Sequence, residues 1–313
     1  MSHLQLFFAC LAAVAALLVL LELKTSRPDG ALVQVHPYRQ VMWYILPSRN
    51  ESVVYFDKYL DATELLAYLD QAKDKFDATL NHVLVAAIAK GISQNPTMNR
   101  FVSGRRLYQR NALWIGFSVK RKKLDREAKL VVAKQRVEPG MTLQQLCAAI
   151  EERVGVERSG KTTYSDREVG LLTKIPRLLF VLAYPLVHKL DYYNLLPASF
   201  MDGDPLYSSA VISNLGSVGM EAGYHHLFEW GNCPAFVMVG KIEERPWVVD
   251  GQVVPRPILH IRFSYDERID DGLSAGHGIA SIQRVLENPF EELGCLKDDG
   301  SDAVSLNSPP EAA

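Results

Sequence analysis

The N-terminal segment is the sequence feature that most restricts what this chain can fold into. Residues Leu4–Leu23 form an apolar run interrupted only by Gln5 and Glu22, and the stretch Leu6–Leu21 is continuous. Twenty helical residues span about 30 Å, which is the thickness of the hydrocarbon core of a bilayer. The run therefore predicts a transmembrane helix over residues 1–24.

A cleaved signal peptide is the alternative interpretation of this run. Such a peptide has a positively charged start, a shorter apolar stretch and small residues at its cleavage site. Here Met1–His3 carries no Lys or Arg, and the run ends in Leu21–Lys24 without small residues, which favours an uncleaved anchor. The basic residues that follow the span are Lys24, Arg27, Arg39 and Arg49. By the positive-inside rule they predict a single-pass membrane protein whose C-terminal domain is cytoplasmic.

The remaining composition is that of a globular protein. The chain has 313 residues, of which 48% are hydrophobic and 22% charged, and its formal net charge is −2. This length can bury one large core or two small ones, and the lack of a basic surplus indicates no nucleic-acid partner. The cysteines have neither the spacing of a zinc site nor that of a disulfide framework, so no metal is expected. They are Cys10, Cys147, Cys233 and Cys295.

Local patterns predict a mixture of helices and strands after a short linker at residues 25–35. Capping boxes indicate helix starts at Asp61–Glu64 and at Thr142–Gln145. Thr79 can cap another helix, which should stop near Pro96. β-Branched and aromatic residues predict strands at residues 53–56, 113–119, 130–135, 209–215, 235–242 and 257–265. Without a clean βαβ alternation, the predicted class is α+β, or α/β with a mixed sheet.

Two further segments carry predictions about domain organisation. Residues 171–190 are strongly apolar, but charged residues and prolines interrupt them. These interruptions disfavour a second transmembrane span and favour a core helix or a helix at the membrane surface. Residues 291–313 are acidic and rich in small residues, which predicts a disordered tail. The folded domain is accordingly expected at residues 36–290.

Four motifs, in order along the chain, carry a resemblance to one protein family. Residues Ser264–Gly272 read Ser-Tyr-Asp-Glu-Arg-Ile-Asp-Asp-Gly. This segment resembles the active-site signature Asp-His-Arg-x-x-Asp-Gly of dihydrolipoyl acyltransferases, the core component of 2-oxoacid dehydrogenase complexes. Residues Asn111–Val119 and Ile212–Gly216 resemble that family's Ile-Gly-Ile-Ala-Val and Ile-Ser-Asn-Leu-Gly stretches. Residues Lys241–Pro246 and Val253–Pro257 resemble the strand-turn-strand before the signature.

The resemblance covers residues from about Arg39 to Pro289 and implies a fold and an activity. The implied fold is a chloramphenicol acetyltransferase-like two-layer sandwich with a mixed sheet, assembled as a homotrimer with active sites between subunits. The implied co-substrate is acyl-CoA, with no bound cofactor. Neither a lipoyl-lysine motif nor a Pro/Ala-rich swinging linker precedes the domain in this sequence. A standard dehydrogenase-complex core is therefore not expected.

Family chemistry requires a base for the proton of the acceptor and a donor for the oxyanion. By its place in the matching motif, Ser213 is the implied hydroxyl donor. The alternative for Ser213 is a strand-end serine that bonds to the backbone. The resemblance makes Asp271 a structural residue that pairs with an early arginine, for which Arg39 is the best candidate. The alternative for this pair is two exposed charges of little energetic consequence.

Glu267 stands where the family signature has its catalytic histidine. A carboxylate is a weak base at neutral pH unless burial raises its pKa, and its negative charge opposes a developing oxyanion. Three interpretations stay open for Glu267: a catalytic base, part of a site that binds without turnover, or a surface or ion-paired residue. His226, beside His225, and His277 are possible substitute bases, although a histidine is more often a hydrogen-bonded core residue.

Two functions follow from these observations. The first is a membrane-anchored acyltransferase that moves an acyl group from acyl-CoA to a thiol or hydroxyl of a small molecule or carrier. It would use Glu267, Ser213 and Asp271. The second is a catalytically inactive trimeric scaffold or acyl-CoA- or partner-binding module, which the loss of the histidine favours. The acidic residues around Glu267 lack the spacing of a calcium loop, so they indicate no cation site.

Overall fold

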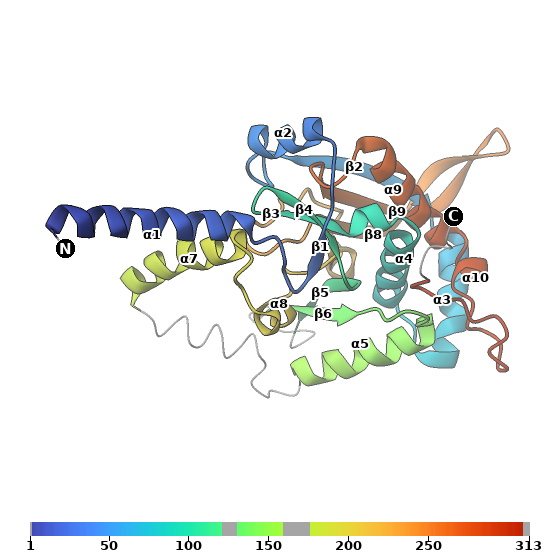
Figure 1. The fold of residues 1–313 in the computed structure, drawn as a ribbon. Coiled ribbons are helices and arrows are strands. Elements are labelled where there is room, and N and C mark those ends of the chain that lie inside the picture. The colour runs from blue at the N-terminus through green and yellow to red at the C-terminus, as the bar shows by residue number, and fades with distance from the viewer. Residues whose placement is uncertain (1, 121–129, 159–175, 309–313) are drawn as a thin grey trace.

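A six-stranded mixed sheet forms the centre of the domain (Figure 1). The structure, a computed structural model, describes residues 2–120, 130–158 and 176–308. The strands lie in the order β2 (Val53–Asp61), β9 (Gln252–Asp266), β8 (Ala235–Val249), β7 (Ala210–Asn214), β5 (Trp114–Lys120) and β6 (Leu130–Arg136). Strand β7 runs parallel to β5 and to β8, and the other pairs are antiparallel. The predicted mixed-sheet class is confirmed.

Helices cover one face of this sheet and enclose the main core. They are α3 (Thr63–Phe76), α4 (Leu80–Gln94), α5 (Leu143–Arg158) and α9 (Gly272–Glu287). Apolar residues of alternate sheet positions, such as Ile212, Val237 and Ile261, pack in the same cluster as Leu84 and Ile88 of α4. Helix α4 is buried around most of its circumference, which explains why its sequence shows apolar residues on more than one face.

A loop covers the opposite face of the sheet. Val211 and Met238 point to that face and pack against Ala222 in the segment that follows β7. This segment begins with the 3-10 helix η2 (Gly216–Val218). A Cβ atom on Gly216 would lie 2.4 Å from the carbonyl oxygen of Gly240, so only glycine allows the loop to approach β8 this closely.

A small second sheet joins the N-terminal segment to the domain. Its strands lie in the order β1 (Gly30–Leu32), β4 (Arg106–Arg110) and β3 (Arg100–Ser103). Three further helices are short. Helix α2 (Pro37–Ile45) follows β1 in the sequence, the 3-10 helix η1 (Pro96–Asn99) connects α4 to β3, and α8 (Ala198–Gly203) precedes β7. The structure places β1, and the buried side chain of Arg27 beside it, where the sequence predicts a linker at residues 25–35.

Helix α1 (His3–Leu23) extends away from the domain, and none of its residues is buried (Figure 1). Among the described residues it is the one helix that is long and apolar enough to cross a membrane. The predicted N-terminal helix is therefore confirmed as a helix. Helix α7 (Arg177–Tyr192) also has no buried residue. Of the two alternatives predicted for residues 171–190, a core helix and a helix at the membrane surface, the core helix is therefore wrong. Residues 171–175 of that prediction lie outside the described part.

Several local predictions are confirmed by the hydrogen bonds of the helix ends. Thr79 caps α4 in a capping box with His82, and the Thr142 side chain accepts from the Gln145 backbone at the start of α5. The C-terminal segment differs from the predicted tail. After the short helix α10 (Pro289–Glu292), Leu293 and Leu306 are completely buried in the main core. These two leucines attach residues 293–308 to the domain.

Candidate active site

A buried ion pair stands at the end of β9, where the signature segment begins. The Arg268 guanidinium donates from Nε and Nη2 to the two carboxylate oxygens of Asp266, at 2.9 and 2.8 Å. Both side chains are at least 95% buried. A bidentate arrangement of this kind fixes the geometry of both groups, so the pair gives the turn between β9 and α9 a defined shape.

Two neighbouring segments hold this turn in place. The Ser52 hydroxyl, just before β2, donates to Asp266 Oδ1 at 2.9 Å, and the Ser52 carbonyl accepts the backbone N–H of Glu267 at 3.0 Å. From α2, the Trp43 indole N–H donates to the carbonyl of Arg268 at 3.3 Å. The backbone of the turn is thus bonded on both sides of Glu267, and that residue occupies a fixed place on the surface.

Glu267 itself is exposed in the single chain. Its carboxylate makes no hydrogen bond or ion pair with any other residue that the structure describes. Two hollows in the described part of the chain are lined by other residues. Neither of these two hollows is formed around Glu267.

Ser213 lies near the end of β7 and is half-buried. It points to the loop-covered face, because it is two residues from Val211, which packs on that face. Within the described ranges its hydroxyl has no hydrogen-bond partner, so the backbone bond of the alternative interpretation, a strand-end serine, is not formed. The hydroxyl is free to donate to a ligand at this face.

The register of the sheet separates Ser213 from Glu267. Ser213 lies opposite Met238, and Met238 lies opposite Arg262 on β9. Glu267 is five residues farther along the chain than Arg262, which corresponds to about 17 Å along the sheet at about 3.4 Å per residue. In one chain, then, the two residues are at different ends of the sheet.

The expected pair of Arg39 with Asp271 is not formed in the single chain. Asp271 is exposed and caps α9, because its carboxylate accepts the backbone N–H of Ser274 at 2.8 Å. This hydrogen bond, with a smaller contribution from the more distant Arg39 guanidinium, lowers the pKa of Asp271. The buried pairing of the signature is made instead by Asp266 and Arg268. Sequence reasoning missed it because both partners belong to the same turn.

Unpaired buried groups remain beside the signature. Asp270 is buried, and its Oδ1 accepts the backbone N–H of Asp271 at 2.9 Å. Its Oδ2, the Tyr265 hydroxyl and Arg39 Nη2 are buried without a partner in the part of the chain that the structure describes. Three orphaned polar atoms this near the turn indicate that α2 and the signature enclose a polar, solvent-excluded layer.

The two candidate substitute bases lie in different places. His226 is exposed and stacks on His225, whose own ring stacks on Phe236 at 4.0 Å between centroids. The His225 carbonyl accepts from the hydroxyl of Ser264, so this pair of histidines is at the same end of the sheet as Glu267. Burial lowers the pKa of His225. His277 is exposed in the middle of α9, and no contact connects it to the turn.

A polar cluster that the sequence did not reveal lies on the same row of the sheet as Ser213. Asp57 of β2 lies opposite Arg262. Its carboxylate accepts hydrogen bonds from Tyr224, His260 and Arg262 at 2.6, 2.7 and 2.7 Å. Partial burial alone would raise the pKa of Asp57. The three hydrogen-bond donors lower the pKa by more than burial raises it, and the result is a pKa of about 2. Nothing in the sequence indicates that these distant residues converge.

Replacing Asp57 by asparagine should reduce stability only above the acid range. The pKa of Asp57 is lower in the folded chain than in the unfolded chain. The stabilisation is therefore complete above about pH 4 and is lost as the pH falls towards 2. Since the side chain is about one-third exposed, the expected loss at pH 7 is about 1 kcal/mol. Denaturant unfolding at pH 7 and at pH 2.5 measures it. The exposed Asp74→Asn is the control, and a pH-independent difference would contradict the assignment.

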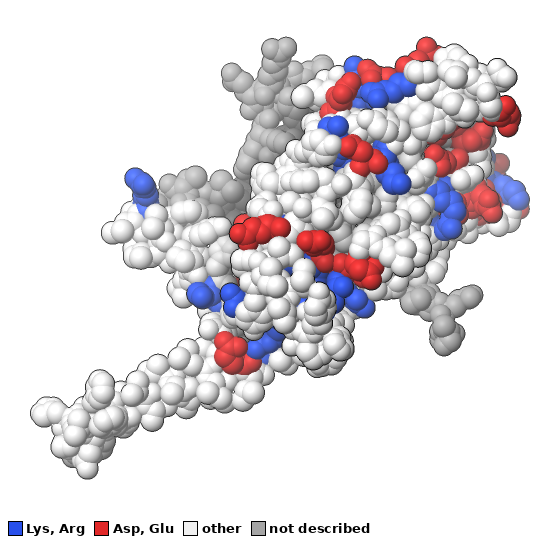
Figure 2. Space-filling view, turned by 90° about the horizontal axis from the view of Figure 1, so that it is seen from above, with Lys and Arg blue, Asp and Glu red and all other residues white. Residues whose placement is uncertain are grey.

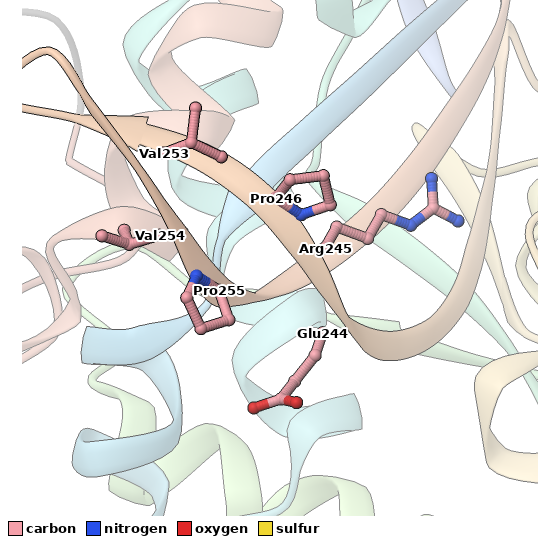
Figure 3. A pocket seen from close by; sticks show the side chains of 6 residues that line it. All are labelled: Glu244, Arg245, Pro246, Val253, Val254 and Pro255. Atoms are coloured by element: carbon pink, nitrogen blue, oxygen red, sulfur yellow. The ribbon is translucent and has the colours of Figure 1, made fainter.

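A shallow hollow lies on the long β8–β9 hairpin (Figure 3). Its lining consists of Glu244, Arg245, Pro246, Val253, Val254 and Pro255. In Figure 3 the side chains of Glu244 and Arg245 point away from each other, so they do not converge on a common point. The hollow lies on residues 244–246 and 253–255, farther along β8 than Met238, which is opposite Ser213. None of its side chains is therefore assigned to the candidate site.

The chain belongs to the family of 2-oxoacid dehydrogenases acyltransferase (catalytic domain), whose model matches residues 29–173 and 203–293. One relative is the dihydrolipoyllysine-residue succinyltransferase component of the 2-oxoglutarate dehydrogenase complex of Pseudomonas aeruginosa. It is 42% identical over 60 residues, 18% of this chain and 15% of that protein. Another is the dihydrolipoyllysine-residue acetyltransferase component of the Staphylococcus aureus pyruvate dehydrogenase complex. It is 34% identical over 84 residues, 26% of this chain and 19% of that protein. The matches thus span less than a fifth of these relatives.

Solved structures confirm the predicted chloramphenicol acetyltransferase-like α/β fold. A probable dihydrolipoamide acetyltransferase from Listeria monocytogenes has a TM-score of 0.55 at 16% identity, covering 90% of this chain and 97% of that chain. A truncated catalytic core of the 2-oxoacid dehydrogenase multienzyme complex from Thermoplasma acidophilum has a TM-score of 0.53 at 18% identity, covering 83% and 99%. At these identities the similarity is one of fold.

Proposed function

We propose that this protein is a membrane-anchored, acyl-CoA-dependent acyltransferase whose site lies between copies of a homotrimer. The observation that carries the proposal is the sheet register: Ser213 and Glu267 are about 17 Å apart along the sheet in one chain. Family membership supports the reaction class. The unpartnered Ser213 hydroxyl and the fixed but uncovered Glu267 are the two halves of a site that a neighbouring copy completes.

In this proposal Glu267 takes the role of the family's histidine. It removes the proton of an acceptor thiol or hydroxyl as the sulfur or oxygen attacks the thioester carbonyl. The Ser213 hydroxyl of the other copy donates to the oxyanion that forms. The intermediate then collapses, the carbon–sulfur bond to CoA breaks, and the proton passes from Glu267 to the departing thiolate. The Asp266–Arg268 pair holds the turn and does not contact the reacting atoms.

Helix α1 is the proposed anchor, with the domain on the cytoplasmic side. Its length and its complete exposure support this role, and the basic residues after it agree with the positive-inside rule. Figure 2 shows α1, the arm at lower left, without charged side chains until it reaches the domain. The cytoplasm is where we expect the acyl-CoA donor, so this orientation gives the proposed site access to it.

Turnover by the purified full chain in detergent tests the activity. Acetyl-CoA and longer acyl-CoA donors should release free CoA thiol in the presence of a panel of thiol and alcohol acceptors. Sedimentation in the same detergent should give the mass of three chains. A monomer that turns over would contradict the shared site, because one chain does not bring Ser213 and Glu267 together.

A binding module without turnover is the second candidate, and the exposure of Glu267 on the single chain favours it. The thermal stability of the full chain with CoA separates the two functions. A ligand present at 100 times its dissociation constant adds about 2.7 kcal/mol to the free energy of unfolding. Stabilisation of this size without release of thiol from any donor and acceptor pair would establish binding alone, whereas turnover would exclude it.

A further inference from the structure

Of the three parts of the chain that the family model does not match, the first two meet in space. The family match begins at residue 29 and is interrupted between residues 173 and 203. Helix α1 lies in the first unmatched part and α7 in the second. Arg27, after α1, forms an ion pair with Asp191 of α7 at 3.1 Å, and the Asn194 side chain donates to the Lys24 carbonyl at 3.0 Å. The C-terminal ends of both helices therefore share one joint.

This joint is rigid and anchored in the domain. The Arg27 side chain is fully buried, pairs with Asp29 as well as Asp191, and lies over the ring of Phe101 at 4.8 Å. Burial alone would lower the pKa of Arg27. The carboxylates of Asp191 and Asp29 raise the pKa by more than burial lowers it, so the guanidinium stays charged. Asp29 and Phe101 belong to the matched domain. The direction in which α1 and α7 leave the domain is thus set by the same cluster.

Helix α7 presents apolar side chains to solvent along its first three turns. The exposed fractions of Leu178, Leu182 and Leu186 are 70%, 61% and 59%, and Leu179 and Val181 are each 55% exposed. Among the described residues, α7 contacts the domain from Tyr184 onwards: Tyr184 stacks on Trp230 at 5.4 Å between centroids, and Val187 and Leu190 pack against a small apolar cluster. A row of exposed large apolar side chains of this kind marks a membrane or protein contact rather than a surface kept in water.

We propose that α7 is an interfacial membrane helix whose exposed leucines, Leu178, Leu182 and Leu186, insert into the leaflet next to the domain. Both α1 and α7 project from the same end of the molecule (Figure 1), so insertion of α1 brings α7 to the bilayer. Sixteen residues extend about 24 Å, which is too short to cross. Arg177 at the start of α7 and Lys189 near its end keep their charges at the headgroups while these leucines contact acyl chains.

This inference rests on α1 as the proposed anchor. It adds that α7 fixes the orientation of the domain relative to the membrane. A single spanning helix leaves the attached domain free to rotate and tilt above the membrane. A second contact, fixed to the first through Arg27 and Asp191, removes that freedom. The domain is then held with one defined side towards the lipid, and the intersubunit site keeps a constant height and orientation above the headgroups.

Lipid contact of α7 can be measured in the full chain reconstituted in phosphatidylcholine–phosphatidylglycerol vesicles. An environment-sensitive nitrobenzoxadiazole label is placed on Leu182→Cys in a Cys10→Ser background, since the other three cysteines are buried. The matched control is Val248→Cys on the β8–β9 hairpin, at 65% exposure. A third sample carries the label on native Cys10 in α1. We expect the label at residue 182 to be quenched by doxyl lipids and protected from aqueous iodide, and the label at residue 248 to show the opposite.

The outcomes separate the inference from the anchor. Lipid quenching at Cys10 with iodide access at residue 182 leaves α1 as the anchor and overturns the role of α7. Protection from iodide at residue 182 without lipid quenching also overturns it, because a second copy of the chain then covers the helix. Lipid quenching at residue 182 with iodide access at Cys10 supports α7 as a membrane contact and removes α1 as the anchor. Iodide access at both positions overturns both proposals.

Discussion

Replacement of Glu267 by glutamine should lower kcat/KM for acyl transfer from acyl-CoA by about 10²- to 10⁴-fold. The substitution keeps the size of the side chain and removes its ability to accept a proton, and a positioned base contributes a factor of this order. Because Glu267 is exposed and unpaired on its own chain, the change should leave the thermal stability of the chain unaltered. Release of CoA thiol under subsaturating donor measures the rate.

Three companion variants make this result specific. Glu244→Gln is the same chemical change at an exposed position of the hairpin (Figure 3) and should retain full activity. Ser213→Ala removes the proposed oxyanion donor and should cost about 10²- to 10³-fold in kcat. Glu267→His introduces the histidine of the signature that this segment resembles and should turn over, with a rate that rises with pH through about 6.5. Parental activity in Glu267→Gln, combined with loss in Ser213→Ala, would assign the base to another residue.

The same logic distinguishes His226 as the base. His226 lies at the end of the sheet that carries Glu267, through the contact of His225 with Ser264. If the His226→Gln variant lost activity while Glu267→Gln kept it, the proton would be taken by the imidazole. Such a result would leave the intersubunit site in place and change only the residue that acts in it.

Local patterns were enough to place most helices and strands of the domain. Thr79 and Thr142 have hydroxyls that satisfy N–H groups at a helix start, and this chemistry needs no tertiary contact, so both starts are found where the sequence predicts them. Strands β3 and β4 and helix α2 were missed, since their apolar positions are few and their stability comes from packing. Leu306 shows the same limit, because one buried leucine attaches a segment whose composition resembles a disordered tail.

The candidate site was predictable as a set of residues but not as a geometry. Motif positions indicated Ser213 and Glu267, yet their separation follows from strand pairing, which the sequence does not specify. The sequence offers many arginines as partners of Asp271, and it does not show whether Arg39 is the right one. It also does not show that the Asp271 side chain caps a helix. The neighbouring pair Asp266 and Arg268 could be noticed only once their burial was known.

Replacement of Asp266 by alanine should lower the free energy of unfolding by about 3–5 kcal/mol. The change leaves the Arg268 guanidinium buried without its carboxylate, and breaking a buried ion pair on one side costs energy of this order. It also removes the acceptor of the Ser52 hydroxyl. The exposed Asp74→Ala on α3 is the matched control and should change stability by less than about 0.5 kcal/mol. Denaturant unfolding followed by tryptophan fluorescence measures both.

A double-mutant cycle shows whether the pair or the packing is responsible. In the variant that combines Asp266→Ala with Arg268→Met, no uncompensated charge stays buried, so its destabilisation should be smaller than the sum of the two single changes by several kcal/mol. Additive losses would mean that the two side chains act independently. Turnover provides the second readout, because the pair shapes the turn that carries Glu267. The double variant should fold more stably than Asp266→Ala yet still lose kcat, since packing alone does not restore the position of the base.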